Sequence, residues 1–117
     1  MLINDTTFTA IDFESAGTAS GKTDAPIQIG TATWSVEHGI SDQWMSYITT
    51  DQDITWAAQK VHGITKEDLE DAPKMTLLWP SIKRRLKNVA VVAHGKGTEK
   101  RFLRAFPGHG FGPWIDT

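Results

Sequence analysis

Polar and hydrophobic residues alternate in three stretches of the first half of the chain, a period-two pattern that is typical of β-strands. The stretches are Phe8–Glu14, Ile27–Trp34 and Gln43–Ile48. In the first stretch, Ile11 and Phe13 are expected to face a core, whereas Asp12 and Glu14 project from the opposite face. His38–Asp42 is expected to be a hairpin-like connection, so the stretches predict an antiparallel meander.

After the third stretch, the apolar residues recur every three or four positions, which indicates helices. Thr55–Val61 predicts a short helix that stops at Gly63, and Thr65–Asp68 resembles a capping start for another short turn. A longer helix is predicted from an apolar stripe formed by Met75, Leu78, Trp79, Ile82 and Leu86. Pro80 fits this helix only if it begins near Thr76, because proline is tolerated in or just past the first turn.

Val89–Ala93 is continuously apolar, which predicts a parallel strand covered on both faces. A helix with Phe102, Leu103 and Phe106 on its apolar side is expected to follow, and Trp114–Thr117 begins an element that the sequence does not complete. This order of elements predicts an α/β fold in which a three-strand antiparallel meander is extended by a parallel strand. Helices are expected to pack on the sheet, and the last part of the fold is expected to be missing.

At 117 residues, the chain is long enough for one domain with a modest core, and we assign residues 1–117 to a single domain. A hydrophobic share of 39% predicts a packed, soluble protein, and no stretch approaches the ~20 apolar residues that span a bilayer. Met1–Asp5 has no basic start followed by an apolar stretch, so no secretory signal is expected, and the absence of cysteine excludes disulfides and thiolate zinc sites. A cytoplasmic protein without a membrane partner is expected.

The formal net charge of −2 hides an uneven distribution. Residues 1–82 carry twelve acidic residues and four lysines, whereas residues 83–104 carry eight basic residues and a single acid, Glu99. The basic residues are Lys83, Arg84, Arg85, Lys87, Lys96, Lys100, Arg101 and Arg104. They are expected to form either a phosphate-attracting flank beside an acidic centre or a solvated helix face.

Asp12 and Glu14 are the leading candidates for a metal site. Two carboxylates held this close repel each other unless a hard cation lies between them, and oxygen ligands favour Mg²⁺ or Mn²⁺ over zinc. The alternative is that this Asp-x-Glu sequence merely ends an exposed strand. Further motifs along the chain favour the metal site.

Three segments resemble the motifs of the DnaQ-like, or DEDDh, 3′-to-5′ exonucleases. This family belongs to the ribonuclease-H-like superfamily and includes ribonuclease T, oligoribonuclease and the proofreading subunit of DNA polymerase III. Phe8–Gly17 resembles the first motif, Val61–Thr65 a segment that lies near the substrate's 3′ end, and Val91–Leu103 the second motif. The resemblance implies a ribonuclease-H-like fold and two-metal phosphodiester hydrolysis at the 3′ ends of single-stranded DNA or RNA.

By this resemblance, the catalytic and metal-binding residues are Asp12, Glu14 and Glu99, with two Mg²⁺ or Mn²⁺ ions in the complete site. Asp12 is expected to bridge both ions, Glu14 to serve the first, and Glu99 to bind or position the second. Two residues depart from the family pattern, since Gly95 stands where Asn is usual and Glu99 where Asp is usual. The alternative role of Glu99 is that of an acid in a first helical turn, without a ligand.

The resemblance also implies substrate contacts in the loop after the first strand and in the later motifs, at Ser15, Ala16, Gly17, His62, Ile64, His94 and Lys96. Without the resemblance, His94 is better explained as a structural histidine, Gly63 as a helix stop and Ile64 as a core residue. Trp56 and Trp114 are candidates for stacking on bases, because the other tryptophans lie in core-like patterns.

The family's third motif, a general-base histidine with a fourth acid, has no match in this sequence, and Asp116 is better explained as a helix cap or turn residue. The chain is therefore expected to be an exonuclease domain cut short before that motif, which binds metal weakly and cleaves poorly. Two alternatives are a non-catalytic module that binds nucleic acid or a protein, and a homodimer that pairs the exposed edge of an unfinished sheet.

Overall fold

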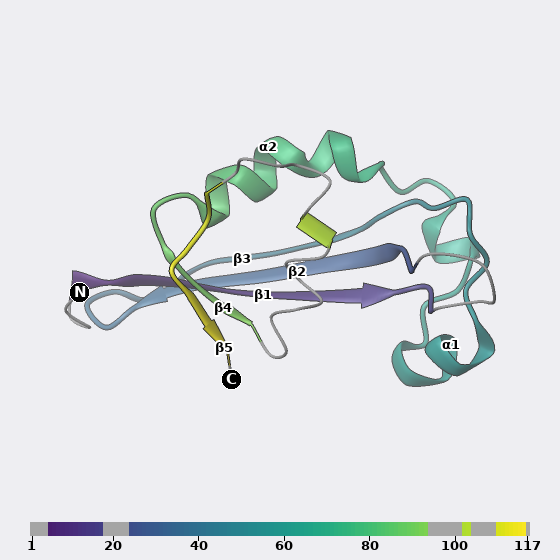
Figure 1. Ribbon diagram of the computed structural model, residues 1–117, viewed down its shortest axis with the longest axis horizontal. Helices are drawn as coiled ribbons and strands as arrows, with labels where there is room; N and C mark the ends of the chain where they lie inside the picture. The colour runs from purple at the N-terminus through teal and green to yellow at the C-terminus, as the bar shows by residue number, and fades with distance from the viewer. Residues whose placement is uncertain (1–4, 18–23, 94–101, 104–109, 117) are drawn as a thin grey trace.

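The computed structural model describes residues 5–17, 24–93, 102–103 and 110–116, and these residues form one sheet with the strand order β3-β2-β1-β4-β5 (Figure 1). The strands are β1 (Thr7–Ser15), β2 (Pro26–Ser35), β3 (Gly39–Tyr47), β4 (Ala90–Ala93) and β5 (Trp114–Asp116). β1, β2 and β3 are antiparallel neighbours, whereas β4 runs parallel to β1 and β5 parallel to β4. The predicted meander with a parallel extension is therefore confirmed. Within these residues, every helix falls short of the length and apolar character that crossing a bilayer requires.

β1 divides its side chains between the two faces of the sheet, as the alternation predicts. Thr9, Ile11 and Phe13 are buried on one face, while Asp12 on the other face is exposed. The Thr9 hydroxyl donates a hydrogen bond to the carbonyl of Arg85 at 3.1 Å, which joins this strand to the helix above it. The burial of one face and the exposure of the other fix the register of β1.

The connection between β2 and β3 is shorter than the sequence suggests. β3 already begins at Gly39, so the turn is confined to residues 36–38, and the connection expected over His38–Asp42 is wrong. Gly39 has a φ of +67°, which glycine adopts readily because it lacks a Cβ. The register shifts between Thr33 and Trp34, and this bulge lets strand pairing begin at the turn glycine itself.

α1 (Trp56–His62) begins and ends where the capping residues predict. The Oγ1 of Thr55 accepts a hydrogen bond from the backbone N–H of Ala58 at 3.1 Å. At the other end, Gly63 has a φ of +72°, and its N–H donates to the carbonyl of Gln59. Gly63 is therefore the stop that the sequence predicts, whereas Thr55, predicted as the first helical residue, is the N-cap.

The two elements after α1 also match the predictions. The 3₁₀ turn η2 (Glu67–Leu69) is preceded by a reciprocal cap, because the side chains of Thr65 and Asp68 each accept the other residue's backbone N–H. α2 (Met75–Leu86) contains Pro80 just past its first turn. The proline is accommodated because the helix begins close to the predicted start.

α2 covers one face of the sheet and builds the main core (Figure 1). Ile82 and Leu86 of α2 pack with Ile11 and Phe13 of β1. Phe102 lies edge-on to Phe13, with 5.3 Å between the ring centroids, so residues 102–103 belong to the same face. The acidic side of β1 is the opposite face.

β4 and β5 complete the described sheet. Ala90, Val91 and Ala93 of β4 are buried, as expected for a central strand between β1 and β5. Asp116 is the last residue of β5 and pairs with Ala93, so its expected role as a helix cap or turn residue is wrong, because strand pairing extends as far as this position. The expected helix residue Phe106 lies outside the described residues.

Candidate active site

Asp12 and Glu14 lie near the carboxyl end of β1, on the face opposite α2. They pair with Gly30 and Gln28 of β2. Because a strand rises ~3.3 Å per residue, their Cα atoms are roughly 7 Å apart on one face, close enough for both carboxylates to share ligands. Asp12 is exposed and Glu14 is half-buried, and within the described part of the chain neither forms an ion pair.

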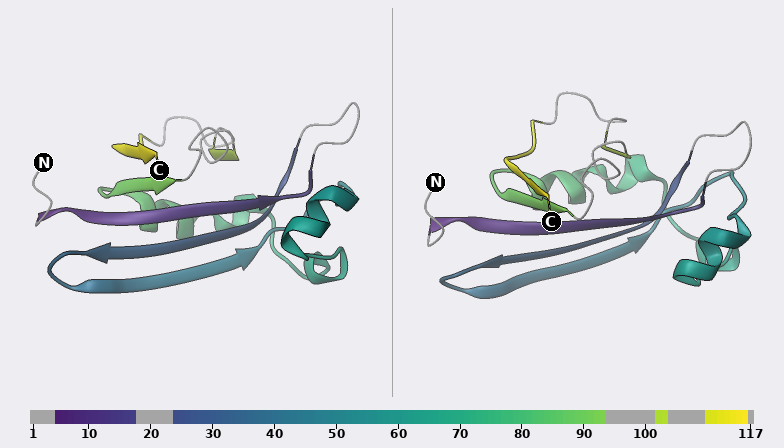
Figure 2. Two further views of the ribbon diagram at one scale, coloured as in Figure 1. Left: turned by 90° about the horizontal axis from the view of Figure 1, so that it is seen from below. Right: turned by 60° about the horizontal axis from the view of Figure 1, so that its bottom comes forward.

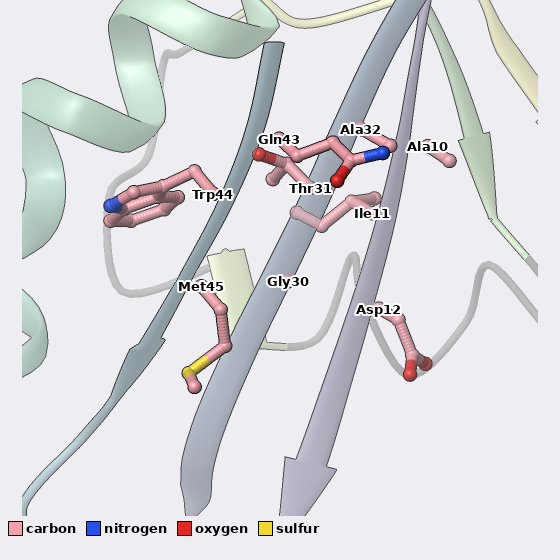
Figure 3. A pocket seen from close by; sticks show the side chains of 9 residues that line it. All are labelled: Ala10, Ile11, Asp12, Gly30, Thr31, Ala32, Gln43, Trp44 and Met45. Carbon is pink, nitrogen blue, oxygen red and sulfur yellow. The ribbon is translucent and has the colours of Figure 1, made fainter. Parts of the chain in front are cut away.

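A hollow of about 520 Å³ lies beside Asp12 on β1 (Figure 3). Its lining comes from β1, β2 and β3, and includes Gln43 and Met45 as longer side chains. Gly30 faces Asp12 across the strands, and no heavy atom lies within 4 Å of the position that a Cβ would occupy there. The surface next to the carboxylate is therefore open to a ligand.

The described residues supply part of a metal site. They contain no group of three or more His, Cys, Asp or Glu side chains that could hold an ion. The expected third acid, Glu99, lies outside the described residues, as do His94 and Lys96. Asp12 and Glu14 offer only oxygen ligands, and Mg²⁺ keeps several waters that an open strand end can accommodate. The pair therefore fits part of a Mg²⁺ or Mn²⁺ site.

The loop that follows the acids is held by hydrogen bonds to its backbone. Ala16 donates its N–H to the carbonyl of Ala25 at 2.9 Å, and Thr55 donates its N–H to the carbonyl of Ala16 at 2.7 Å. The Oδ1 of Asp24 accepts from the N–H of Gly17 at 3.0 Å and from the N–H of Ala25 at 2.9 Å. Ala16 and Gly17, two of the expected substrate-binding residues, are therefore bonded to the residues that directly precede β2 and α1.

Gly17 lies tightly against the start of α1. Its φ is +91°, and a Cβ at this position would collide with Oγ1 of Thr55 and lie 3.1 Å from Cβ of Ala58. The glycine is required twice, by the backbone conformation and by the lack of space. The motif identifies Gly17, but only the structure shows that packing against α1 demands it.

His62 links the end of α1 to the end of β1. Its Nε2 lies 2.9 Å from the carbonyl oxygen of Ser15, and its Nδ1 accepts the backbone N–H of Ile64 at 3.0 Å. Both ring nitrogens are thus engaged within the protein. Substrate contacts by His62 and Ser15 remain predictions.

Ala16 and Ile64 belong to a second, smaller core beneath the loop. They are 0% and 4% exposed and pack with Ile27 and Leu69. Their contact with substrate stays a prediction. Side chains this buried would hold the neighbouring backbone in place rather than line an open surface.

Sequence reasoning missed the contributions of Asp24 and Thr55 to this loop. Thr55 is recognisable as a helix cap, but its bond to Ala16 depends on where α1 docks. Asp24 stands at the end of a loop just before Ala25 and Pro26, a position where an Asp side chain commonly bonds nearby backbone N–H groups. That local signal could have identified Asp24 as a loop clamp.

The basic residues of α2 do not lie beside the acids. The last turn of α2 contacts Thr9 through Arg85, three residues before Asp12 and on the opposite face of the sheet. The side chain of Arg85 is only 11% exposed, because its Nε donates to Asp42 at 2.9 Å and its guanidinium lies 4.5 Å from the ring centre of Trp44. For the described residues, the expected flank beside the acidic centre is wrong. The basic residues from Lys96 onward lie outside them.

The two tryptophans expected to stack on bases differ in accessibility. The Nε1 of Trp114 donates to the carbonyl of Phe111 at 3.0 Å, and its ring packs against the main core. Trp56 is 76% exposed, and the ammonium of Lys60 lies 5.0 Å from its ring centre. Of the pair, Trp56 presents the accessible aromatic face, on a helix that lies beside the end of β1 (Figure 2).

A five-stranded sheet of this order, with helices packed on it and paired acids at the end of β1, defines a ribonuclease-H-like fold of the exonuclease type. The family model for exonucleases of the RNase T type matches residues 9–105. The chain belongs to this exonuclease family, and the resemblance to the DnaQ-like, or DEDDh, group is confirmed.

Among curated proteins, the chain is similar to the PolC-type DNA polymerase III of Thermotoga petrophila and of Thermotoga maritima. It is 31% identical to the first over 95% of this chain and 30% identical to the second over 97% of this chain. The chain spans only 8% of the length of each relative.

Among solved structures, exonuclease X in complex with 5′-overhanging duplex DNA has a TM-score of 0.72 at 23% identity, covering 93% of this chain and 58% of that one. E. coli exonuclease I in complex with an oligonucleotide has a TM-score of 0.71 at 17% identity, covering 86% of this chain and 23% of that one. The nuclease domain of 3'hExo, described as a DEDDh family member bound to rAMP, has a TM-score of 0.70 at 15% identity, covering 84% of this chain and 56% of that one. Identities this low establish the shared fold alone.

Proposed function

We propose that this chain is the acid-bearing part of a Mg²⁺- or Mn²⁺-dependent 3′-to-5′ exonuclease that removes nucleotides from single-stranded DNA or RNA. The observation that carries the proposal is the pair Asp12 and Glu14, which share one open face at the end of β1 in a chain of the exonuclease family. Solved structures with the same fold include exonucleases in complex with an oligonucleotide and with rAMP, which supports a nucleic-acid substrate.

In this proposal, Asp12, Glu14 and Glu99 hold the metal ions, which supply charge stabilisation for the phosphodiester and lower the pKa of the attacking water. Ser15 at the end of β1, with Ala16 and Gly17 after it, would form the surface against which the terminal nucleotide rests. The hydrogen bonds that hold Ala16 and Gly17 support this role, because a fixed backbone holds a bound group in one orientation. His94 and Lys96 would contact the substrate from the strand end and the segment after β4.

We further propose that these 117 residues do not themselves supply a general-base histidine and a fourth acid. The 117 residues alone would then bind metal weakly and cleave poorly, because a base is needed to take the proton of the attacking water.

Trp56 and Lys60 are proposed to hold a nucleotide upstream of the 3′ end. An exposed indole offers a flat face for any base, and the neighbouring ammonium offers a charge for the phosphate. The N-cap of α1 is bonded directly to Ala16, so this surface is fixed relative to the acids.

The test is hydrolysis of a single-stranded oligonucleotide with a free 3′ end by the protein at its natural length. Asp12→Asn removes a metal-binding charge at nearly constant volume and is expected to abolish cleavage in Mn²⁺. Glu37→Gln, at the exposed hairpin tip, is the matched control and should leave cleavage unchanged. Binding of the oligonucleotide without cleavage, unaffected by Asp12→Asn or by chelator, would instead indicate a non-catalytic binding module.

A further inference from the structure

His62 makes two hydrogen bonds whose directions assign its ring tautomer. The backbone N–H of Ile64 can only donate, so the Nδ1 that it contacts at 3.0 Å carries no proton. The other nitrogen, Nε2, then carries the proton and donates to the carbonyl oxygen of Ser15 at 2.9 Å. The ring of His62 therefore bridges two backbone segments.

The regular backbone hydrogen bonding between β1 and β2 is interrupted at Ser15, so the carbonyl of Ser15 depends on the N–H of His62. Ser15 pairs with Pro26 of β2, and proline has no backbone N–H to offer. The register of the ladder also shifts between Glu14 and Ser15. His62 supplies an N–H at the residue that directly follows Glu14.

α1 is thus attached to the end of β1 at two points. Thr55, before its first residue, donates its backbone N–H to the carbonyl of Ala16 at 2.7 Å, and His62, its last residue, donates to Ser15. Gly63 already closes the helix through its own bond to Gln59, so the bond from His62 to Ser15 serves the strand rather than the helix.

We infer that His62 is a positioning residue: its bond to Ser15 holds the end of β1, and with it the carboxylate of Glu14, in the orientation that the metal site requires. The inference rests on the proposed function, and it differs from the substrate contact that the family resemblance implies for this histidine. A group that orients a metal ligand commonly changes metal affinity by about 10–100-fold when it is removed.

Two substitutions separate the two bonds of His62. His62→Gln places an amide N–H near the position of Nε2 and is expected to keep the bond to Ser15. His62→Asn places an amide oxygen near the position of Nδ1, so it keeps the bond to Ile64 but is too short to reach Ser15. Both replacements are neutral and polar, and thermal unfolding of each variant provides the control for folding.

The experiment measures Mn²⁺ affinity by titration, and kcat and KM on a single-stranded oligonucleotide, in the protein at its natural length. His62→Asn is expected to weaken Mn²⁺ binding by about 10-fold or more and to lower kcat by about 10–100-fold, with KM changed less than threefold. His62→Gln should retain most of the Mn²⁺ affinity and most of kcat. In the unsubstituted protein, ¹⁵N spectra should show the neutral ring with its proton on Nε2.

Recovery by Asn but not by Gln would overturn the inference, because it would assign His62 to the helix end alone. Failure of both variants through an increase in KM would also overturn it, in favour of direct substrate contact. If the unsubstituted protein binds no Mn²⁺ and cleaves nothing, the proposed function fails instead. In that case the ¹⁵N spectrum still tests whether His62 bridges Ser15 and Ile64, and a proton on Nδ1 would exclude this bridge.

Discussion

The substitution Gly17→Ala tests the clamp between the loop after β1 and α1. The new Cβ would occupy a residue with a φ of +91° and would collide with Oγ1 of Thr55. A positive φ costs an L-residue roughly 1–2 kcal/mol. Overpacking costs about 1–3 kcal/mol more, since Cβ of Ala58 also lies only 3.1 Å away. We therefore expect a loss of about 2–5 kcal/mol in the free energy of unfolding.

Gly39→Ala is the matched control for this measurement. Gly39 also has a positive φ, +67°, but a Cβ added in this open hairpin would meet no heavy atom within 4 Å, so only the backbone cost of about 1–2 kcal/mol applies. Both variants are compared by urea denaturation at 25 °C with a common m-value. The excess loss in Gly17→Ala reports the packing against α1.

A third substitution identifies the colliding side chain. Thr55→Ala alone should cost about 1 kcal/mol, because it removes the side-chain cap of α1. Combined with Gly17→Ala, the same change should cost less or become stabilising, since it also removes the collision. Equal losses for Gly17→Ala and Gly39→Ala, or strict additivity with Thr55→Ala, would refute the reasoning.

Two other pairs of substitutions test the buried ion pair and the proposed stacking surface. Arg85→Met should lower the free energy of unfolding by about 2–3 kcal/mol, because it removes a largely buried charged hydrogen bond to Asp42 and the stacking on Trp44. Asp42→Asn added to Arg85→Met should lower the free energy of unfolding little further, because its partner is already gone. Trp56→Ala should leave the unfolding midpoint unchanged, because the side chain is mostly exposed, but should raise KM for a single-stranded oligonucleotide about 5–100-fold, with Lys60→Gln giving a smaller increase. An unchanged KM would exclude the proposed stacking surface.

Local signals in the sequence predict most of this fold. The alternation around Asp12 correctly separates the buried and exposed faces of β1, because side-chain direction along a strand depends only on the strand itself. The stop at Gly63 is predicted equally well, since its N–H bonds to backbone within the same helix. The start of β3 at Gly39 is not predicted, because a bulge at Ser41 within β3 shifts the register of its pairing with β2.

The support of the candidate site depends on contacts that sequence patterns do not reveal. His62 and Ser15 are 47 residues apart, and their bond exists only because α1 docks against the end of β1. Arg85 counts as one of several surface charges in the sequence, yet the strand beside it supplies Asp42 and Trp44 as partners. The acids are found from their spacing, whereas the groups that orient them emerge only from the tertiary structure.

The central claim is that Asp12 and Glu14 together hold a divalent cation. The most direct measurement is an anomalous-difference map from crystals of the protein at its natural length soaked in MnCl₂, compared with crystals of Asp12→Asn. The account predicts a Mn²⁺ peak at about 2.1 Å from a carboxylate oxygen of Asp12, with Glu14 turned toward it, and no such peak in the variant. An empty face at the end of β1, or a peak that persists in Asp12→Asn, would contradict it.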